Sequence, residues 1–207
     1  MSCILTDESL EISSTPNLLG GLDIVGIRGQ ENELEGSQGT DSILGGNLND
    51  IIKGGSGFDF IDGKVGNDVL NGNRDNDFII GGDGNDIING GDGEDLLYGD
   101  AGNDVLSGNR GDDQLRGGEG KDTLKGGLGC DQLYGEQGQD TFVLEFFDSV
   151  DTIVDFNVDE DTIRLKGIGA DANVEYDKAT GKLSVDGNEI AELEAGLNIT
   201  DNNYEIF

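Results

Sequence analysis

Large apolar residues recur at every ninth position through the middle of the chain. The residues before each large apolar residue are rich in glycine and aspartate, whereas the nearest neighbours of that apolar residue are mostly β-branched or aliphatic. Glycine adopts positive φ at little cost, and β-branched residues favour strands. Each nine-residue unit is therefore predicted to form a tight turn followed by a short strand. The apolar positions are Ile43, Ile52, Ile61, Leu70, Ile79, Ile88, Leu97, Leu106, Leu115, Leu124, Leu133 and Phe142.

The unit length predicts how the strands stack. Nine residues are too few for a helix and a return, so two units make one coil of eighteen residues with a turn at each end. Units i and i+2 then stack along the same edge, as in other solenoids. The expected fold is all-β, a parallel β-roll with two nonapeptides per coil over residues 36–143.

Both ends of the chain depart from the strict period. Two degenerate units keep the apolar position at Val25 and Leu34, and they predict an N-terminal cap within residues 1–35. After Asp140 the period ends and longer alternating strands follow. We therefore expect a C-terminal β cap over residues 144–207.

Composition adds a strong requirement for cations. Asp and Glu number 44 against 12 Lys and Arg, which gives a formal charge of −32, and 37 residues are glycine. Such a chain repels itself when compact unless cations join it. Nucleic acid and anionic lipid are disfavoured as partners. No apolar run approaches the roughly 18 residues of a membrane span, and the N-terminus lacks the basic start and apolar run of a cleaved signal.

The same composition argues against catalysis. Without histidine there is no Ser-His or Cys-His pair, and the many carboxylates are explained by the repeat. Zinc, iron and copper are poor fits for a chain with no histidine and only two cysteines, Cys3 and Cys130, which are expected to be free thiols. We expect a protein that is not an enzyme.

The unit resembles a known motif. Residues 81–89, GGDGNDIIN, show its clearest copy, and the pattern GGxGxDxUx, with U a large apolar residue, is similar to the RTX (hemolysin-type) calcium-binding nonapeptide repeat. This resemblance implies calcium ions between turns i and i+2, in two ladders on opposite edges. One ladder contains Asp41, Asp59, Asp77, Asp95, Asp113 and Asp131, and the other contains Asp50, Asp68, Asp86, Asp104, Asp122 and Asp140.

Backbone carbonyls are expected to complete each calcium site. Calcium takes six to eight hard oxygen ligands, which carboxylates and bare glycine backbone can supply, and five gaps on each edge allow up to about ten ions. Magnesium fits less well because it requires stricter octahedral geometry. The predicted carbonyl ligands are those of Gly55, Gly57, Gly82, Gly84, Gly91, Gly93, Gly102 and Gly120.

Several turns lack an expected glycine. Leu48 and Asp75 replace the second turn glycine, and the gaps around them are predicted to be weaker than those within residues 81–107. Other replacements lie next to the first glycine. These are Lys64, Asn73, Asp100, Asn109 and Glu136.

The C-terminal segment leaves two questions open. Residues 151–156 and 161–165 resemble the segment that closes RTX rolls, so Asp151, Asp155 and Asp161 are either further calcium ligands or acids on turns and edge strands. The last residues, Tyr204–Phe207, resemble the end of an uncleaved type I secretion signal, and they fit equally well as a final strand.

A second apolar row lies one residue after the repeat aspartate. Strand alternation directs this row outward. It is either a surface that contacts a partner or a second roll, or a result of strand propensity alone. Its members are Ile51, Phe60, Val69, Phe78, Ile87, Leu96 and Val105.

Three functions fit the sequence. The first is an extracellular, secreted calcium-binding protein that folds in millimolar external calcium. The second is a carbohydrate-binding module similar to the non-catalytic R-modules of alginate epimerases, with Arg74, Arg110 and Arg116 as contacts to an extracellular polysaccharide. A cytosolic calcium buffer is the third, and only the C-terminal tail argues against it.

Overall fold

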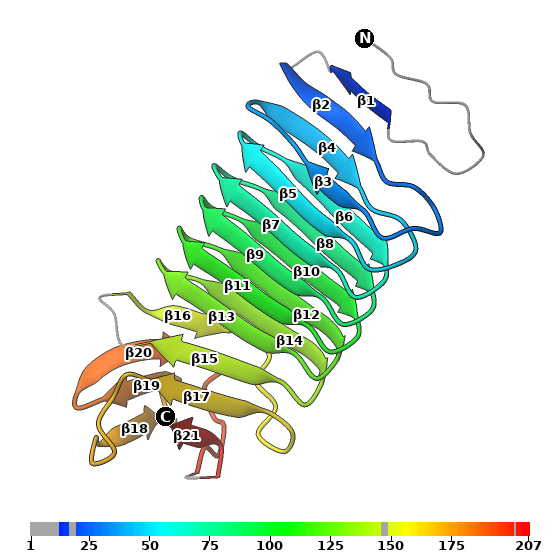
Figure 1. The fold of residues 1–207 in the computed structure, drawn as a ribbon. Coiled ribbons are helices and arrows are strands. Elements are labelled where there is room, and N and C mark those ends of the chain that lie inside the picture. Colours follow the sequence, from blue (N-terminus) through cyan, green and yellow to red (C-terminus); the bar gives the residue numbers. More distant parts are fainter. Residues whose placement is uncertain (1–12, 17–19, 146–148, 201) are drawn as a thin grey trace.

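The computed structural model describes residues 13–16, 20–145, 149–200 and 202–207. All the named elements are strands, stacked into an elongated solenoid with the N-terminal strands at one end and the C-terminal strands at the other (Figure 1). The prediction of an all-β parallel roll is confirmed. Among the described residues, no helix is long and apolar enough to cross a membrane.

Two sheets form the walls of the roll. The first has twelve strands, and most of its neighbours are two elements apart in the sequence. In spatial order they are β1 (Ser13–Pro16), β2 (Gly20–Val25), β4 (Thr40–Leu44), β6 (Phe60–Val65), β8 (Phe78–Asp83), β10 (Leu96–Ala101), β12 (Gln114–Gly120), β14 (Gln132–Gly138), β16 (Asp151–Ile153), β20 (Asn188–Glu192), β19 (Lys182–Val185) and β18 (Val174–Asp177).

The second sheet has nine strands and contains the alternate elements. In spatial order they are β21 (Tyr204–Ile206), β17 (Thr162–Lys166), β15 (Thr141–Glu145), β13 (Thr123–Leu128), β11 (Val105–Arg110), β9 (Ile87–Asp92), β7 (Val69–Arg74), β5 (Ile51–Ser56) and β3 (Glu33–Glu35).

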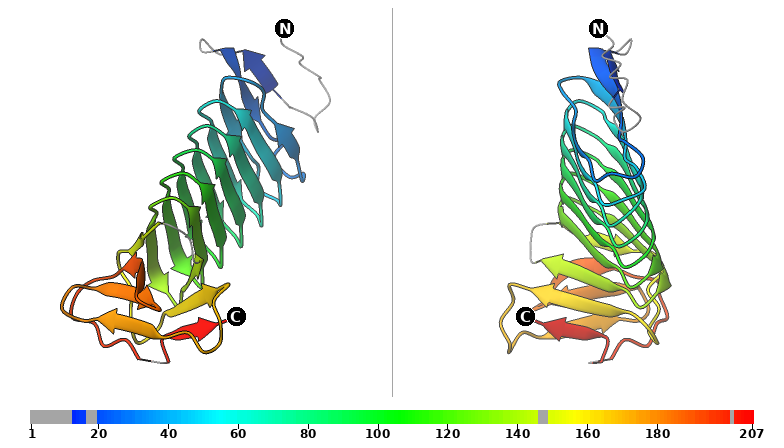
Figure 2. Two further views of the ribbon diagram at one scale, coloured as in Figure 1. Left: turned by 90° about the vertical axis from the view of Figure 1, so that its left-hand side faces the viewer. Right: turned by 45° about the vertical axis from the view of Figure 1, so that its right-hand side comes forward.

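The register shows the predicted coil. Ile61 pairs with Ile79 and Leu97 pairs with Leu115, in both cases eighteen residues further along a parallel strand. The chain therefore crosses one sheet, turns, crosses the other sheet and turns again within eighteen residues. Figure 2 shows these repeated turns along both edges of the roll.

The core is the apolar row that defined the repeat. Every residue from Ile43 to Phe142 in that row is buried, and the row alternates between the two sheets, so that each coil adds two side chains to one continuous file. The prediction of Leu34 as an inward residue is also confirmed. The prediction of Val25 as an inward residue is wrong, because Val25 is 43% exposed whereas Ile24 is 4% exposed. A register shift between Gly20 and Asp23 pairs Ile24, rather than Val25, with Ile43.

Both sheets continue past the end of the strict repeat. β15, β17 and β21 extend the second sheet in parallel, while β16 and β20 extend the first, which then closes with the antiparallel strands β19 and β18. The tail is thus a last strand, with the Arg164 guanidinium 4.0 Å from the centre of the Phe207 ring. Its role as a secretion signal stays a prediction.

The outward apolar residues form two rows instead of one. Ile51, Val69, Ile87 and Val105 lie on the second sheet and are 41–53% exposed. The others lie on the opposite side of the roll, where the rings of Phe60 and Phe78 stack with centroids 5.5 Å apart. The split follows because successive nine-residue units belong to different sheets.

Candidate metal centre

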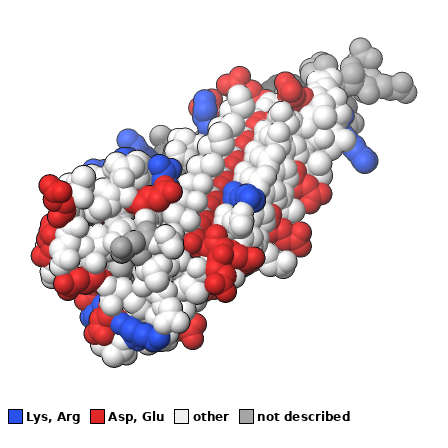
Figure 3. All heavy atoms as spheres, turned by 90° about the horizontal axis from the view of Figure 1, so that it is seen from below, with Lys and Arg blue, Asp and Glu red and all other residues white. Residues whose placement is uncertain are grey.

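The repeat aspartates lie at the end of each turn, immediately before a strand, and form two files along the edges of the roll. Each is at most 3% exposed. Within a file, the backbone N–H of one aspartate donates to Oδ1 of the aspartate one coil later, as from Asp41 to Asp59 (2.8 Å) and from Asp86 to Asp104 (2.7 Å). The structure therefore aligns the residues as the two predicted ladders. Figure 3 shows a narrow file of acidic atoms running along the roll.

The second carboxylate oxygen of most ladder aspartates has no partner. Within the described part of the chain, the following Oδ2 atoms are buried and make no hydrogen bond. They belong to Asp59, Asp68, Asp77, Asp86, Asp95, Asp104, Asp113, Asp122, Asp131 and Asp140. Burying a charged oxygen without a hydrogen bond or counter-charge costs several kcal/mol, so these positions favour a bound cation.

The first two turns differ from the rest. Ser37 N–H donates to Asp41 Oδ2 and Gly46 N–H donates to Asp50 Oδ2, both at 2.6 Å. These two aspartates are therefore satisfied by their own turns. They are in the predicted ladders, but they lack the unpartnered oxygen that marks the other ten.

Burial changes the acidity of the ladder. It raises the pKa of Asp77 to about 8 and that of Asp104 to about 7, and neighbouring ladder carboxylates raise both further, against the lowering effect of a backbone hydrogen bond. The pKa of Asp86 is raised to about 6, again mainly by burial. Without a cation, many of these carboxylates therefore hold protons near neutral pH.

Glycine is required where the turns approach one another. A Cβ on Gly72 would overlap Oδ2 of Asp77, and a Cβ on Gly102 would overlap the carbonyl oxygen of Gly84 in the preceding coil. The carbonyls of Gly84, Gly93, Gly102 and Gly120 all point in this way across the gap between stacked turns. Each of these four carbonyls approaches the glycine of the stacked turn one coil later, and their role as calcium ligands stays a prediction.

Most of the non-glycine replacements keep the glycine conformation. Asp75 has a φ of 70°, and positive φ is also found at Lys64, Asn73, Asp100, Asn109 and Glu136. The turn before Asp77 therefore retains its shape and its unpartnered Oδ2 despite Asp75. Each such residue costs of order 1–3 kcal/mol.

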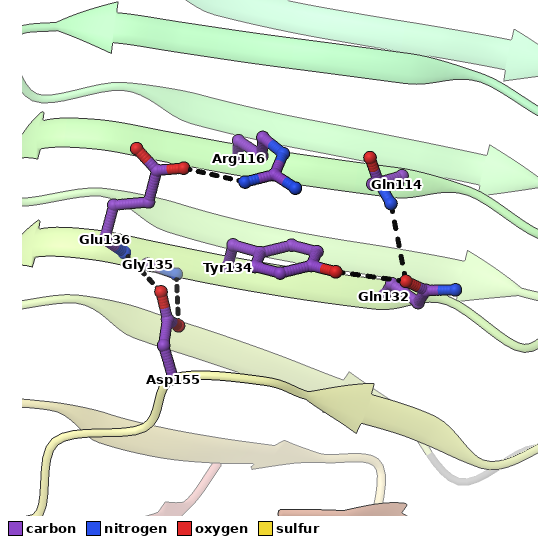
Figure 4. A network of polar contacts seen from close by, with 7 residues as sticks. All are labelled: Gln114, Arg116, Gln132, Tyr134, Gly135, Glu136 and Asp155. Atoms are coloured by element: carbon purple, nitrogen blue, oxygen red, sulfur yellow. Dashed lines mark hydrogen bonds and ion pairs between the residues drawn. The ribbon is translucent and has the colours of Figure 1, made fainter.

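The ladders continue beyond the repeat. Asp131 N–H donates to Asp151 Oδ1 (3.2 Å) and Asp140 N–H donates to Asp161 Oδ1 (2.9 Å), across gaps of twenty and twenty-one residues. Asp155 has a different role, because its two oxygens accept the N–H groups of Gly135 and Glu136 (Figure 4).

Two features of the edges were not predicted from the sequence. Asn32 takes the ladder position one coil before Asp50, and its N–H donates to Asp50 Oδ1 (2.6 Å). The second is a file of exposed asparagines, Asn49, Asn67, Asn85 and Asn103, each accepting the N–H of the residue one coil later at 2.7–2.9 Å. We call it the asparagine file. The signal was an asparagine directly before four successive aspartates of one ladder.

The donor set fits calcium. Carboxylate and carbonyl oxygens are the hard ligands that calcium takes in flexible geometry. Among the described residues, no three Asp, Glu, His or Cys side chains converge on one point. The oxygens that do approach one another are one carboxylate per turn and the carbonyls of adjacent coils.

The family comparison agrees with this geometry. The family model of the RTX calcium-binding nonapeptide repeat, a model of four copies, matches residues 29–61, 44–79, 71–106, 80–115 and 107–142. No curated protein sequence matches the chain. The crystal structure of the extracellular lipase LipA from Serratia marcescens is similar with a TM-score of 0.30 and 20% identity over 81% of this chain. The match spans 40% of that lipase chain.

Proposed function

Because the chain belongs to the family of RTX calcium-binding nonapeptide repeat proteins, we propose that it folds into its roll when it binds several calcium ions, and that it does not catalyse a reaction. The observation that carries this proposal is the set of ten buried Oδ2 atoms without partners. Six of them lie beside a glycine carbonyl of the next coil, so their gaps offer oxygens of both kinds; these belong to Asp59, Asp68, Asp77, Asp86, Asp104 and Asp122.

Electrostatics explains why metal binding is coupled to folding. Ladder aspartates one coil apart are separated by about 4.8 Å, and two charges at this distance repel by about 3 kcal/mol at an effective dielectric constant near 20. Without a cation, the folded chain must either bear this repulsion along both edges or hold protons on its ladder carboxylates, whereas an extended chain does neither. Cations between the turns replace the repulsion between carboxylates with attraction to the metal. The free energy of calcium binding therefore contributes to the free energy of folding.

The expected stoichiometry is up to about ten ions. Ten calcium ions add a charge of +20 to the formal −32, which leaves −12. The central gaps are bordered by unpartnered oxygens, whereas Asp41 and Asp50 at the N-terminal end have hydrogen-bonded ones. The N-terminal gaps should therefore bind calcium last.

A calcium titration tests the proposal. Circular dichroism should change from a largely unstructured to a β-rich spectrum as calcium is added to chelated protein, with a steep dependence, and magnesium should substitute poorly. Asp86→Asn keeps Oδ1 but removes the charge beside two gaps. Its calcium midpoint should rise by about tenfold or more, since a loss of 1.4 kcal/mol is tenfold in affinity.

The matched control is Glu94→Gln, which removes one charge from an exposed turn residue outside the ladders. Its midpoint should stay unchanged. A chain that is β-rich in excess chelator at neutral pH, or that folds equally well in magnesium, contradicts the proposal.

We also propose that the folded protein acts outside the cell. Low cytosolic calcium would leave the chain unfolded for export through a type I system, and millimolar external calcium would fold it. The tail from Tyr204 to Phe207 supports this by its resemblance to a secretion signal.

Deleting residues Tyr204 to Phe207 should abolish export. Because β21 pairs only at the end of the second sheet, the truncated chain should still fold in calcium. Normal export of the truncated chain would identify the tail as a strand alone.

A further inference from the structure

The outer faces of the two sheets carry opposite charge. The basic face covers β5, β7, β9, β11 and β13, and the acidic face covers β6, β8, β10, β12 and β14. On the basic face the charged residues are Lys53, Arg74, Asp92, Arg110 and Lys125, a net charge of four minus one, or +3. On the acidic face they are Asp62, Lys64, Asp83, Asp100, Arg116, Glu119 and Glu136, a net charge of two minus five, or −3.

The exposed charges of the two faces have the same spacing. Arg74 and Arg110 occupy the third position before a ladder aspartate and are two coils apart, with Asp92 on the strand between them. Arg110 lies 3.7 Å from Asp92 in an ion pair that is well exposed to solvent and therefore weak. Asp83 and Glu119 occupy the same repeat position on the other sheet and are also two coils apart, with Ala101 between them. Both pairs are thus separated by about 9.6 Å along the roll.

The remaining charges of the acidic face are largely paired within it. Arg116 bonds Glu136 at 3.0 Å and lies 4.0 Å from the centre of the Tyr134 ring (Figure 4). Lys64 pairs with Asp62. We therefore assign recognition of a partner to Asp83 and Glu119, which are both exposed.

Each face also has an apolar row directly after the ladder aspartates. On the basic face the row is Ile51, Val69, Ile87 and Val105, and on the acidic face it is Phe60, Phe78 and Leu96. The row on the basic face is exposed and that on the acidic face is half-buried. Apolar rows rimmed by polar residues and open to solvent are typical of protein interaction surfaces. The polar residues here are of opposite sign on the two faces, so the partner that fits the basic face is the acidic face of another roll.

Strand direction fixes the orientation of the two copies. The chain crosses the two sheets in opposite directions, so the charged position lies at one edge of the basic face and at the other edge of the acidic face. A second copy with its roll axis reversed places apolar row over apolar row and charged row over charged row. We infer that copies of this protein associate through these faces, with Arg74 against Glu119 and Arg110 against Asp83. This inference rests on the proposed calcium-dependent fold.

Magnitudes place this association among weak interfaces. Five strands at about 4.8 Å by six residues at about 3.3 Å give a face of roughly 500 Å², so roughly 1,000 Å² is buried by a pair. Interfaces of that size are transient. The net negative charge of the protein opposes association. Charges further apart than about 8 Å are screened at physiological salt, so the charges on the two facing surfaces determine whether those surfaces attract each other. Because the basic face of one copy contacts the acidic face of the next, each pair retains one free face of each kind. Further copies can therefore add to form an open stack.

Charge reversal tests the interface. In calcium, the wild-type sedimentation coefficient should rise with protein concentration up to the millimolar range. The variant Arg74→Glu/Arg110→Glu has two acidic faces, and the variant Asp83→Lys/Glu119→Lys has two basic faces, so each alone should remain monomeric. An equimolar mixture should associate again, because each variant then offers the face that the other needs. Phe60→Ser/Phe78→Ser should weaken association without any change of charge.

Matched controls separate this inference from the proposed fold. Arg28→Glu/Lys121→Glu makes the same charge change on exposed turn residues away from both faces and should associate as the wild type does. Circular dichroism in calcium must show each variant folded. Folded wild type that stays monomeric at every concentration, reversed variants that associate alone, or a mixture that fails to associate would each overturn the inference.

Discussion

The two edges of the roll contain the same aspartate ladder but hold their coils together differently. On the edge of the Asp50 ladder, the asparagine file bonds each coil to the next over four successive steps. On the edge of the Asp41 ladder the same position holds Phe58, Asn76, Glu94, Asp112 and Cys130. Among the described residues there, Asn76 and Asp112 make the equivalent bond, at 3.0 and 2.8 Å.

This difference separates two sources of order. Hydrogen bonds of the asparagine file need no metal, whereas the buried carboxylates of both ladders need a counter-charge. The Asp50 edge should therefore retain register between coils when calcium is scarce, and the Asp41 edge should depend on calcium more completely. Backbone amide hydrogen exchange can follow the two edges separately.

The largest expected effect is that of pH on the metal-free chain, and it should act on both edges. Burial raises the pKa of Asp77 to about 8 on one edge and that of Asp68 to about 7 on the other, so the folded chain binds more protons than the unfolded chain above about pH 4. Stability without calcium should fall as pH rises from 4 to 8. Circular dichroism in chelator should show β structure gained on acidification. A signal that is constant over this range contradicts proton binding by the buried ladder carboxylates.

Calcium affinity should show the opposite pH dependence. A ladder carboxylate with a pKa of about 7, such as Asp113, must lose its proton before it ligates a cation. Lowering the pH from 8 to 6 should raise the calcium midpoint by about tenfold for each such proton displaced. Calorimetric titrations in buffers of different ionisation enthalpy should detect the released protons. Binding that releases no protons at pH 6 would argue against buried, protonated ladders.

Glycine replacements change the backbone of one turn without changing a carboxylate of either ladder. Lys64→Gly removes a side chain from a position with a φ of 79° and should stabilise the calcium-bound roll by about 1 kcal/mol. The matched control is Lys53→Gly within β5, which should destabilise by a similar amount since glycine weakens a strand. Urea unfolding in saturating calcium measures both. Destabilisation by Lys64→Gly would mean that its ion pair with Asp62 outweighs backbone strain.

The smallest predicted effect is specific to one edge. Asn85→Ala removes an acceptor for Asn103 N–H and should cost about 1 kcal/mol at limiting calcium. Glu94→Ala at the equivalent position of the other edge should cost less than half as much. Hydrogen exchange at the amide of residue 103, compared with that of residue 112, should show the loss on the Asp50 edge alone. Equal effects on both edges would remove the distinction between them.

Much of the fold followed from the sequence because a solenoid is nearly one-dimensional. Each unit contacts only its neighbours, so a residue such as Leu97 or Asp86 has the same surroundings as its equivalents one coil away. The core row, the coil length and the alignment of both ladders were predicted on that basis. The prediction that Val25 faces inward was wrong because a register shift between Gly20 and Asp23 interrupts the nine-residue period.

The nine-residue period predicts a stack of turns and strands with aligned acidic residues, since equal spacing places equal residues above one another. The role of each copy of the repeat depends on the tertiary structure. The tertiary structure satisfied Asp41 and Asp50 within their own turns, left the Oδ2 atoms of ten other aspartates without a hydrogen bond and brought Asp151 and Asp161 into the ladders across longer loops. These outcomes depend on distances between atoms in different coils and on which sheet each unit enters, and spacing along the chain does not specify either.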